Sequence, residues 1–321
     1  MRIAVTGSIA TDHLLTFDGR FADSVLPEQL ANLSVSFLAS DLQVRRGGTG
    51  ANIAFGMASL GLTPVLVGSV GTDAADYVAA LAAAGVDVAG VTTSQTLATA
   101  RFTCTTDHDH AQIATFYPGA MSEAALIDLS ALPGVDLVLI APDDPGAMAR
   151  HTSSCRDRGV PFAADPSQQL AFLQGPAIRH LVEGATWLFT NEYEAGLVHE
   201  KTGWSEEQVL QRVTTRVTTL GAKGVRITRR GEPPVEVGVV TARAIAEPTG
   251  VGDAFRAGFL AATGWGLGLE RAAQVGALLA TYVVETVGTQ EYAFTPQEFG
   301  GRLAAAYGED AAAEVAGHLG D

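Results

Sequence analysis

Short apolar runs alternate with segments of helical character along most of the chain, and this alternation restricts the fold more than any other feature. The apolar runs predict strands at Ile3–Thr6, Pro64–Gly68, Asp136–Ile140, Phe162–Asp165, Trp187–Thr190, Arg216–Thr219 and Gly224–Thr228. Helices are expected at Asn52–Leu60, Ala74–Ala84, Gly146–Arg158, Gln174–Glu183, Glu192–Lys201, Ser205–Arg212, Gly252–Thr263, Glu270–Thr286 and Pro296–Tyr307. Strands separated by helices build parallel βαβ units with right-handed crossovers. We therefore expect an α/β fold in which helices flank a doubly wound, mostly parallel sheet.

Two strand-rich segments, 13–46 and 93–117, interrupt this alternation. The first has few helical signals, and the second predicts two strands around the polar turn Asp107–His110. Adjacent strand residues point to opposite faces, so a solvated hairpin tip is preferred over a metal site for this turn. We expect the two segments to form a small β lid over an active-site cleft. The α/β core is then expected to comprise residues 1–12, 47–92 and 118–321.

Charge and cysteine content limit the classes of partner. The net charge of −15 offers no basic surface for nucleic acid or for an anionic membrane. Cys104 and Cys155 lack the spacing of a metal site or a disulfide framework, which favours free thiols in a reducing compartment. The apolar run after Arg2 is too short for a signal peptide, and no stretch approaches the ~20 apolar residues that span a bilayer. We expect a soluble cytoplasmic protein with a small-molecule substrate.

The segment Glu247–Gly258 carries the clearest chemical signal. Pro248 prevents a helix before the turn, the glycines of Gly250–Gly252 permit a tight turn, and a helix begins at once. The positive end of that helix would bind a phosphoryl group in transfer. Asp253, in the first helical turn, would serve as general base for an attacking alcohol. The helix dipole is expected to lower its pKa below the usual ~3.9, which phosphoryl transfer tolerates because it depends mainly on positioning.

Two other interpretations of this segment stay open on the residues alone. An acidic residue in the first turn is common at ordinary helix starts. The pattern Gly250-x-Gly252-x-x-Phe255 also partly matches a dinucleotide-binding fingerprint, with Glu270 about twenty residues further on, although phenylalanine at its third position opposes close helix–strand packing. No Walker A motif occurs, so any phosphotransfer would use another architecture.

Four further motifs precede this turn in a fixed order. They are Gly7-Ser8-Ile9-Ala10-Thr11-Asp12, Gly47-Gly48-Thr49-Gly50-Ala51-Asn52, Asn191-Glu192-Tyr193-Glu194 and Thr219-Leu220-Gly221-Ala222-Lys223-Gly224. Together with the G-x-G-D at Asp253, they resemble the ribokinase/PfkB family over nearly the whole chain. The resemblance implies a ribokinase-like fold and an ATP-dependent phosphotransferase with an alcohol acceptor. Where the family usually has D-T-x-G-A-G-D, this chain has Glu247 and Val251, which puts the monovalent-cation (K⁺) site of many members in doubt.

The resemblance also implies roles for single residues. Asp12, Gly48 and Asn52 would contact the sugar, although Asp12 as a turn cap and Asn52 as a helix N-cap are alternatives on the residues alone. The catalytic group would be Asp253, with an anion hole made by Gly250, Val251 and Gly252. ATP would be bound by Asn191, Thr219, Leu220, Gly221, Ala222, Lys223, Gly224 and Gly252, and Mg²⁺ through water by Glu194. A surface position is the alternative for Lys223.

Four other stretches are similar to the actinobacterial adenosine kinases: Ser34–Phe37, Ala100–Thr106, Phe116–Glu123 and Ala164–Leu170. This similarity implies that Phe102 and Phe116 sandwich the purine, whereas a small hydrophobic patch in the lid is the alternative. Polar contacts to the nucleoside would come from Ser8, Ser36, Gln168 and Gln169.

The expected reaction follows from this resemblance. Adenosine and MgATP would give AMP and ADP, a step of purine salvage. Ribose, inosine or cytidine are alternative acceptors, and a non-catalytic nucleotide-binding protein is the more distant alternative. The place of Phe37 in the expected lid points to a homodimer formed through the lid.

Overall fold

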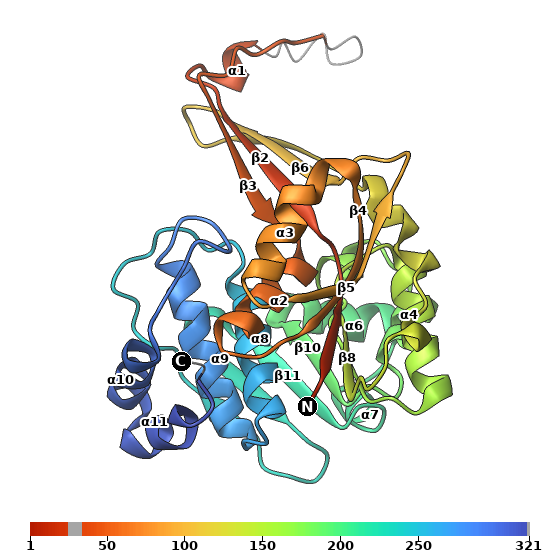
Figure 1. The fold of residues 1–321 in the computed structure, drawn as a ribbon, viewed down its shortest axis with the longest axis vertical. Helices are drawn as coiled ribbons and strands as arrows, with labels where there is room; N and C mark the ends of the chain where they lie inside the picture. Colours follow the sequence, from red (N-terminus) through yellow and green to blue (C-terminus); the bar gives the residue numbers. More distant parts are fainter. Residues whose placement is uncertain (25–33, 320–321) are drawn as a thin grey trace.

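The computed structural model describes residues 1–24 and 34–319 and contains two sheets (Figure 1). The larger sheet has nine strands in the order β13-β12-β11-β10-β9-β8-β1-β4-β5. Its strands are β1 Ile3–Thr6, β4 Val65–Gly71, β5 Asp87–Ser94, β8 Leu137–Ile140, β9 Phe162–Ala164, β10 Trp187–Asn191, β11 Thr215–Thr219, β12 Val225–Thr228 and β13 Val235–Val237. All pairs from β5 to β11 are parallel, and β12 and β13 extend the sheet by antiparallel pairing.

Helices cover both faces of this sheet (Figure 1). The α-helices are α1 Phe21–Ser24, α2 Thr49–Ser59, α3 Ala75–Ala83, α4 Pro145–Arg158, α5 Gly175–Val182, α6 Glu192–Thr202, α7 Glu206–Leu210, α8 Val251–Gly264, α9 Leu269–Val284, α10 Pro296–Tyr307 and α11 Glu309–Ala316. Alternate strand residues enter separate cores: Leu137 and Leu139 join the cluster with α2, α8 and α9, whereas Val138 and Ile140 join the cluster with α4, α5 and α6. This burial of both faces explains why the central strands are continuous apolar runs.

The expected doubly wound α/β fold is confirmed, with small differences at the edges. Strands β5 and β13 and helices α1 and α11 were not expected. Strand β5 reads Asp-Val-Ala-Gly-Val-Thr-Thr-Ser and is the edge strand next to β4, so it lacks the apolar run of a central strand. In the described part of the chain, no helix is long and apolar enough to cross a membrane.

The smaller sheet has the order β3-β2-β6-β7 and projects from one end of the molecule (Figure 1). Its strands are β2 Ala10–Thr16, β3 Asp41–Gly47, β6 Ala100–Thr106 and β7 Gln112–Tyr117. They come from the two segments in which lid strands were expected, except that β2 begins at Ala10, so Asp12 lies on a strand of the smaller sheet. The polar turn Asp107–His110 is the tip of the β6–β7 hairpin, where Asp107 accepts backbone hydrogen bonds from Asp109 and Ala111 at 2.9 Å.

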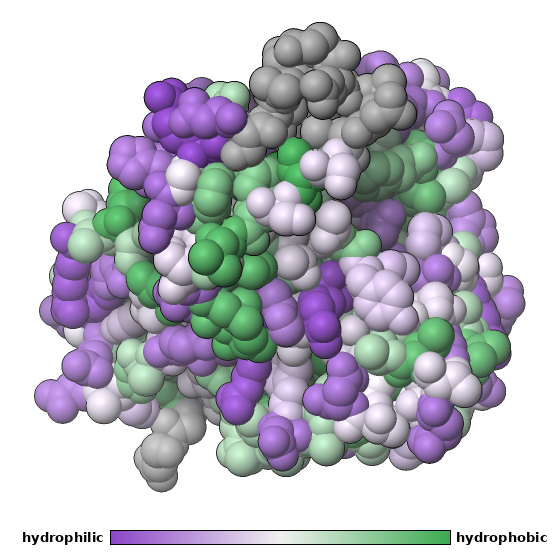
Figure 2. Space-filling view, turned by 90° about the horizontal axis from the view of Figure 1, so that it is seen from above, coloured by the Kyte–Doolittle hydropathy of each residue, from purple (hydrophilic) through white to green (hydrophobic). Residues whose placement is uncertain are grey.

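The two faces of the smaller sheet differ in character. Strand register places Asp12, Phe102 and Phe116 on one face, which we call the inner face. The opposite, outer face carries exposed apolar side chains: Leu42 (55%), Val44 (56%), Ile113 (46%) and Tyr117 (47%). Figure 2 views the molecule from this end and shows apolar residues among those exposed there. At the far end of the sheet, Phe37 packs against Phe17 and Phe21 of the same chain, with ring centroids 5.0 and 4.8 Å apart.

Candidate active site

A cavity of about 500 Å³ lies between the inner face of the smaller sheet and the carboxyl ends of the parallel strands. In doubly wound folds, ligands bind at this edge of the sheet. Eight of the nine residues expected to contact the substrate line the cavity, together with the expected base: Ser8, Asp12, Gly48, Asn52, Phe102, Phe116, Gln168, Gln169 and Asp253. The ninth, Ser36, is exposed and does not line it, because its segment runs beside Phe37 at the far end of the smaller sheet.

Helix α8 begins directly after Gly250, which has a left-handed backbone (φ 78°), and Asp253 lies in the first turn of that helix. A Cβ on Gly250 would meet Thr289 Cγ2 at 2.7 Å, so both the backbone angle and the space require glycine. The first amides of a helix have no intrahelical acceptor, and those of Val251 and Gly252 lie at this helix start. The Val251 amide makes a long hydrogen bond of 3.4 Å to the Pro248 oxygen, which an anion would have to replace. The turn therefore offers an anion site next to a carboxylate.

The expected low pKa of Asp253 is wrong. Burial raises this pKa to about 6, although the hydrogen bond from Asn52 and the charge of Arg256 oppose the shift. Protein atoms surround most of the carboxylate, and the cost of desolvating its charge exceeds the benefit of the helix N-terminus. The result is a stronger base than the sequence indicated, which still carries its charge at neutral pH.

Asn52, on α2, orients the Asp253 carboxylate. Its Nδ2 donates to Asp253 Oδ2 at 2.9 Å. Its Oδ1 accepts from Thr289 Oγ1 and from Gln290 Nε2, both at 2.9 Å, and Gln290 Nε2 also contacts Tyr77 Oη at 2.7 Å. With its oxygen accepting twice, Asn52 can offer a ligand only its second N–H. Thr289, Gln290 and Tyr77 were not expected at this site, because no local motif marks them.

Asp12 faces the same end of the cavity from β2. A Cβ on Gly47, its neighbour on β3, would lie 2.6 Å from Asp12 Oδ2, so this glycine makes room for the carboxylate. Burial raises the pKa of Asp12 to about 6; the charge of Glu247 adds to the shift and Arg45 opposes it. Arg45 itself pairs with Glu247 at 3.1 Å, which links the smaller sheet to the catalytic turn.

Phe102 and Phe116 lie directly opposite each other on the paired strands β6 and β7. Both line the cavity. Aromatic side chains in a cavity wall can stack on a planar ligand. Met121 and Phe172, which were not expected, line the same region.

The segment after β9 brings Gln168 and Gln169 to the cavity. Gln169 Nε2 donates to the backbone oxygen of Asp143 at 2.9 Å. Lys201, on α6, donates to the backbone oxygens of Leu170, Ala171 and Leu173 at 2.6, 2.8 and 3.1 Å. One ammonium group therefore fixes the end of this segment, a role that its sequence position did not suggest.

The two expected nucleotide motifs lie side by side. Asn191 ends β10 and pairs in register with Thr219, which ends β11. Asn191 and Glu194 form a capping box at the start of α6: Asn191 Oδ1 accepts from the Glu194 amide, and Glu194 Oε2 accepts from the Asn191 amide, both at 2.8 Å. The Thr219–Gly224 motif forms the connection from β11 to the antiparallel β12. These residues are near the same sheet edge but do not line the nucleoside-sized cavity.

The described residues contain no group of three or more acidic, histidine or cysteine side chains arranged to hold a metal ion. Among the residues described, Glu194 Oε1 has a single 3.4 Å contact, from Ser167 Oγ, and keeps acceptor capacity. A single carboxylate fits Mg²⁺ that keeps its waters and is bound mainly by phosphates.

Arg256 is buried directly behind the catalytic turn. Its Nε lies 2.5 Å from Asp165 Oδ2, with the two side chains 7% and 0% exposed. Its Nη1 donates to the Gly252 carbonyl at 3.0 Å. Arg256 therefore connects the first turn of α8 to the residue that follows β9, a role that its place in the sequence did not indicate.

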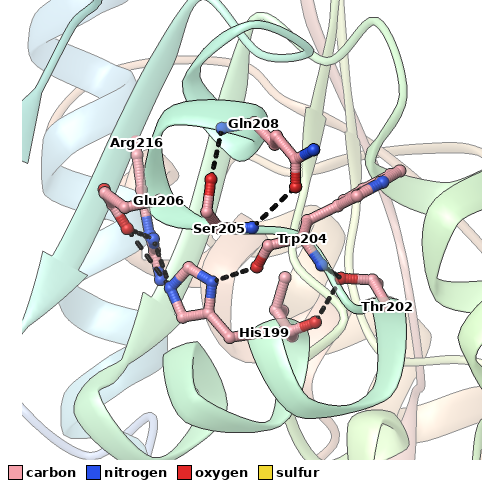
Figure 3. Close-up of polar contacts among 8 residues, drawn as sticks. His199, Thr202, Trp204, Ser205, Glu206, Gln208 and Arg216 are labelled. Carbon is pink, nitrogen blue, oxygen red and sulfur yellow. Dashed lines mark hydrogen bonds and ion pairs between the residues drawn. The ribbon is translucent and has the colours of Figure 1, made fainter.

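A second group of polar side chains lies where α6 meets α7 (Figure 3). His199 Nδ1 is 2.8 Å from the Trp204 oxygen, its Nε2 is 3.2 Å from Glu206, and Arg216 pairs with the same glutamate. Arg216 is near the start of β11, whereas the nucleotide motif begins at its other end, Thr219. These side chains bond to one another away from the cavity, so we assign them a structural role.

Comparison with known proteins agrees with this geometry. Residues 15–296 match the model of the pfkB family of carbohydrate kinases. A nucleoside kinase of Methanocaldococcus jannaschii is 28% identical over 246 residues, which cover 76% of this chain and 80% of that protein. The nucleoside kinase of Burkholderia thailandensis, solved with inosine, has a TM-score of 0.84 and 34% identity over 95% of this chain and 98% of its own. The ribokinase of Cryptococcus neoformans var. grubii, solved with ADP, shares the fold at 20% identity, with a TM-score of 0.79 and coverage of 94% and 99%.

Proposed function

The chain belongs to the pfkB family of carbohydrate kinases, and from this premise we propose that it is an adenosine kinase. It would transfer the γ-phosphoryl of ATP to the 5′-hydroxyl of adenosine, giving AMP for purine salvage. The observation that carries the proposal is Asp253. Its carboxylate is held at 2.9 Å by Asn52, at a helix start, on the wall of a cavity that Phe102 and Phe116 also line.

The chemistry assigned to Asp253 is proton removal. At neutral pH the carboxylate is largely ionised, because its pKa is about 6. It accepts the proton of the 5′-hydroxyl as that oxygen forms a bond to the γ-phosphorus, while the bond from phosphorus to the bridging oxygen breaks and its electron pair leaves with ADP. The amides of Gly250, Val251 and Gly252 donate to the phosphoryl oxygens in transfer.

Other side chains of this site bind and orient the two substrates. Asp12 accepts hydrogen bonds from the ribose hydroxyls, and Gly48 lets the sugar approach the backbone. Bound Mg²⁺ would neutralise phosphate charge, with Glu194 holding it through water. Asn191 and the loop Thr219–Gly224 would hold the nucleotide of ATP, since both end neighbouring parallel strands.

The assignment of adenosine rests on the base end of the cavity. Phe102 and Phe116 offer stacking surfaces, and Ser8, Gln168 and Gln169 offer polar groups. Ser36, away from the cavity, would contribute only after a movement of its segment. Inosine is the second candidate, because the Burkholderia thailandensis kinase was solved with inosine. Cytidine and ribose are weaker candidates, since neither offers a purine to the two phenylalanines.

An acceptor panel tests the proposal directly. ADP release is measured with MgATP and saturating adenosine, inosine, cytidine or ribose, at equal enzyme concentration. Adenosine is expected to have the highest kcat/KM. A higher value with inosine would transfer the assignment to the second candidate, and absence of turnover with all four would contradict the kinase function.

Two further parts of the proposal concern assembly and ions. A homodimer would form through the outer face of the smaller sheet, where Leu42, Val44, Ile113 and Tyr117 are exposed. Sedimentation of the protein with and without Val44→Asp tests this pairing. A K⁺ ion near Glu247 would compete with Arg45, which already pairs with that carboxylate. Comparing kcat in KCl and in choline chloride tests whether K⁺ contributes.

A further inference from the structure

Asp143 is a buried acid in the cavity that the proposed chemistry does not use. It follows β8 and lines the cavity, with its side chain 1% exposed. Its Oδ1 accepts from the Asp144 amide at 2.8 Å, whereas its Oδ2 has no hydrogen-bond partner among the described residues. A buried polar atom without a partner is unusual in a folded protein and indicates that a ligand or water completes it.

The surroundings of Asp143 favour its neutral form. Burial raises the pKa of Asp143 to about 8, and the neighbouring charge of Asp144 acts in the same direction. Of the other acids of the cavity, Asp253 adds to the raised pKa of Asp12, whereas neither contributes to the raised pKa of Asp143. Gln169, which packs against Asp143 from the segment after β9, carries no charge.

The neutral acid has one defined hydrogen-bonding direction. Because Oδ1 already accepts from a backbone amide, the proton is best placed on Oδ2, which then becomes a donor. The backbone oxygen of Asp143 accepts from Gln169 Nε2 at 2.9 Å, and that of the preceding Pro142 accepts from the Ser8 amide at 2.9 Å. Asp143 therefore lies beside two of the polar residues that we assign to the nucleobase.

Resting on the function proposed above, we propose that Asp143 is a specificity-determining residue that donates a hydrogen bond from Oδ2 to an acceptor atom of the nucleobase. In adenine these acceptors are the ring nitrogens N1, N3 and N7. Once ionised, Oδ2 can only accept, and it repels the lone pair of a ring nitrogen. Adenosine affinity is therefore present while Asp143 is protonated and is lost as the pH rises above about 8, by up to about tenfold per pH unit.

The test measures adenosine binding by calorimetry, without ATP, between pH 6.5 and 9.5. For the wild type, the dissociation constant is expected to rise above pH 8. In Asp143→Asn the amide can donate without titrating, so this rise should disappear. Asp143→Ala should raise the dissociation constant about tenfold at pH 7. Asp157 is an exposed acid on α4, and Asp157→Asn is the control for removal of one carboxylate. Its dissociation constant for adenosine should change with pH as that of the wild type does.

Base analogues identify the acceptor. Binding of 1-deaza-, 3-deaza- and 7-deazaadenosine is compared in the wild type and in Asp143→Ala. One analogue is expected to lose affinity in the wild type and to bind both proteins equally. If all three bind the wild type as adenosine does, Asp143 donates to no ring nitrogen and the proposal is wrong. An unchanged alkaline rise in Asp143→Asn would contradict it as well.

Failure of this inference and failure of the proposed function give different results. If the wild type neither binds nor phosphorylates any nucleoside, the function itself fails. If the wild type phosphorylates adenosine while Asp143→Ala binds it with unchanged affinity, only the role of Asp143 fails. An equal increase of KM for ATP and for adenosine in Asp143→Ala would indicate a general structural effect and would also overturn the role.

Discussion

The side-chain amide of Asn52 donates to the Asp253 carboxylate at 2.9 Å, while its oxygen accepts from Thr289 and Gln290. The amide can satisfy all three partners in only one orientation, so residues after α9 determine which way it faces the carboxylate on α8. Asn52 thus acts on the reaction mainly through Asp253. A direct contact with the substrate remains open only through its second N–H.

The first prediction concerns pH. Since the pKa of Asp253 is about 6 and the base must be ionised, kcat should rise with pH through about 6 and level off above 7. The hydrogen bond from Asn52 favours the ionised form, so Asn52→Ala should move this rise to higher pH and lower kcat about 100-fold. Profiles of kcat between pH 5 and 8 check both. An unshifted rise in Asn52→Ala would show that the amide does not act through Asp253.

Arg256 is expected to stabilise the fold and to lower the pKa of the catalytic base, Asp253. Arg256→Met leaves Asp165 buried without its partner, which should cost about 3–5 kcal/mol of unfolding free energy. It should also raise the pKa of Asp253, because the Arg256 charge lowers that pKa. The double variant Asp165→Asn/Arg256→Met should regain much of the stability but keep the displaced kcat profile. Urea unfolding measures the loss of stability, and kcat profiles against pH measure the change in the pKa of Asp253. A wild-type kcat profile in the double variant would contradict an effect of Arg256 on that pKa.

Two lysines should affect different substrates. Lys201→Met removes the donor to three carbonyls of the segment that carries Gln168 and Gln169. It should raise KM for adenosine several-fold and leave KM for ATP unchanged. Lys223→Met, in the expected nucleotide loop, is the matched variant and should do the reverse. Initial-rate measurements with each substrate varied in turn check this, and the same substrate affected in both variants would contradict it.

Asp143 also makes a prediction about stability. Its pKa is about 8 in the folded protein and about 3.8 when unfolded, so the folded state binds more protons between these values. Stability contributed by this group therefore falls as the pH rises from about 4 to 8. Asp143→Asn should match the wild type in Tm near pH 4 and exceed it by at least about 2 °C at pH 8. A constant difference across this range would show that Asp143 does not titrate as described.

The sequence was sufficient to predict the fold, because apolar runs indicate strands and helical patterns indicate helices, and both can be recognised locally. Apolar runs such as Leu137–Ile140 are buried on both faces of the sheet, and the helices between them are long enough to be recognised by their pattern. Strand β5 escaped this reasoning because an edge strand needs no continuous apolar run.

The site was harder to predict from the sequence, because the residues that the prediction missed are brought there by tertiary contacts. Gln290 reaches Asn52 across 238 positions of the chain, and Arg256 finds Asp165 only when α8 packs against the end of β9. The error in the pKa of Asp253 has the same origin. A helix N-terminus can be recognised in a sequence, whereas the burial that outweighs it depends on the surrounding fold.

The central claim is that Asp253 removes the proton of the acceptor hydroxyl, and Asp253→Asn tests it most directly. The amide preserves the shape of the side chain but cannot accept this proton. Calorimetry should show adenosine binding within a few-fold of the wild type, and ADP release with adenosine should fall about 10²–10⁴-fold in kcat. Adenosine binding retained together with a near-normal kcat would contradict the claim.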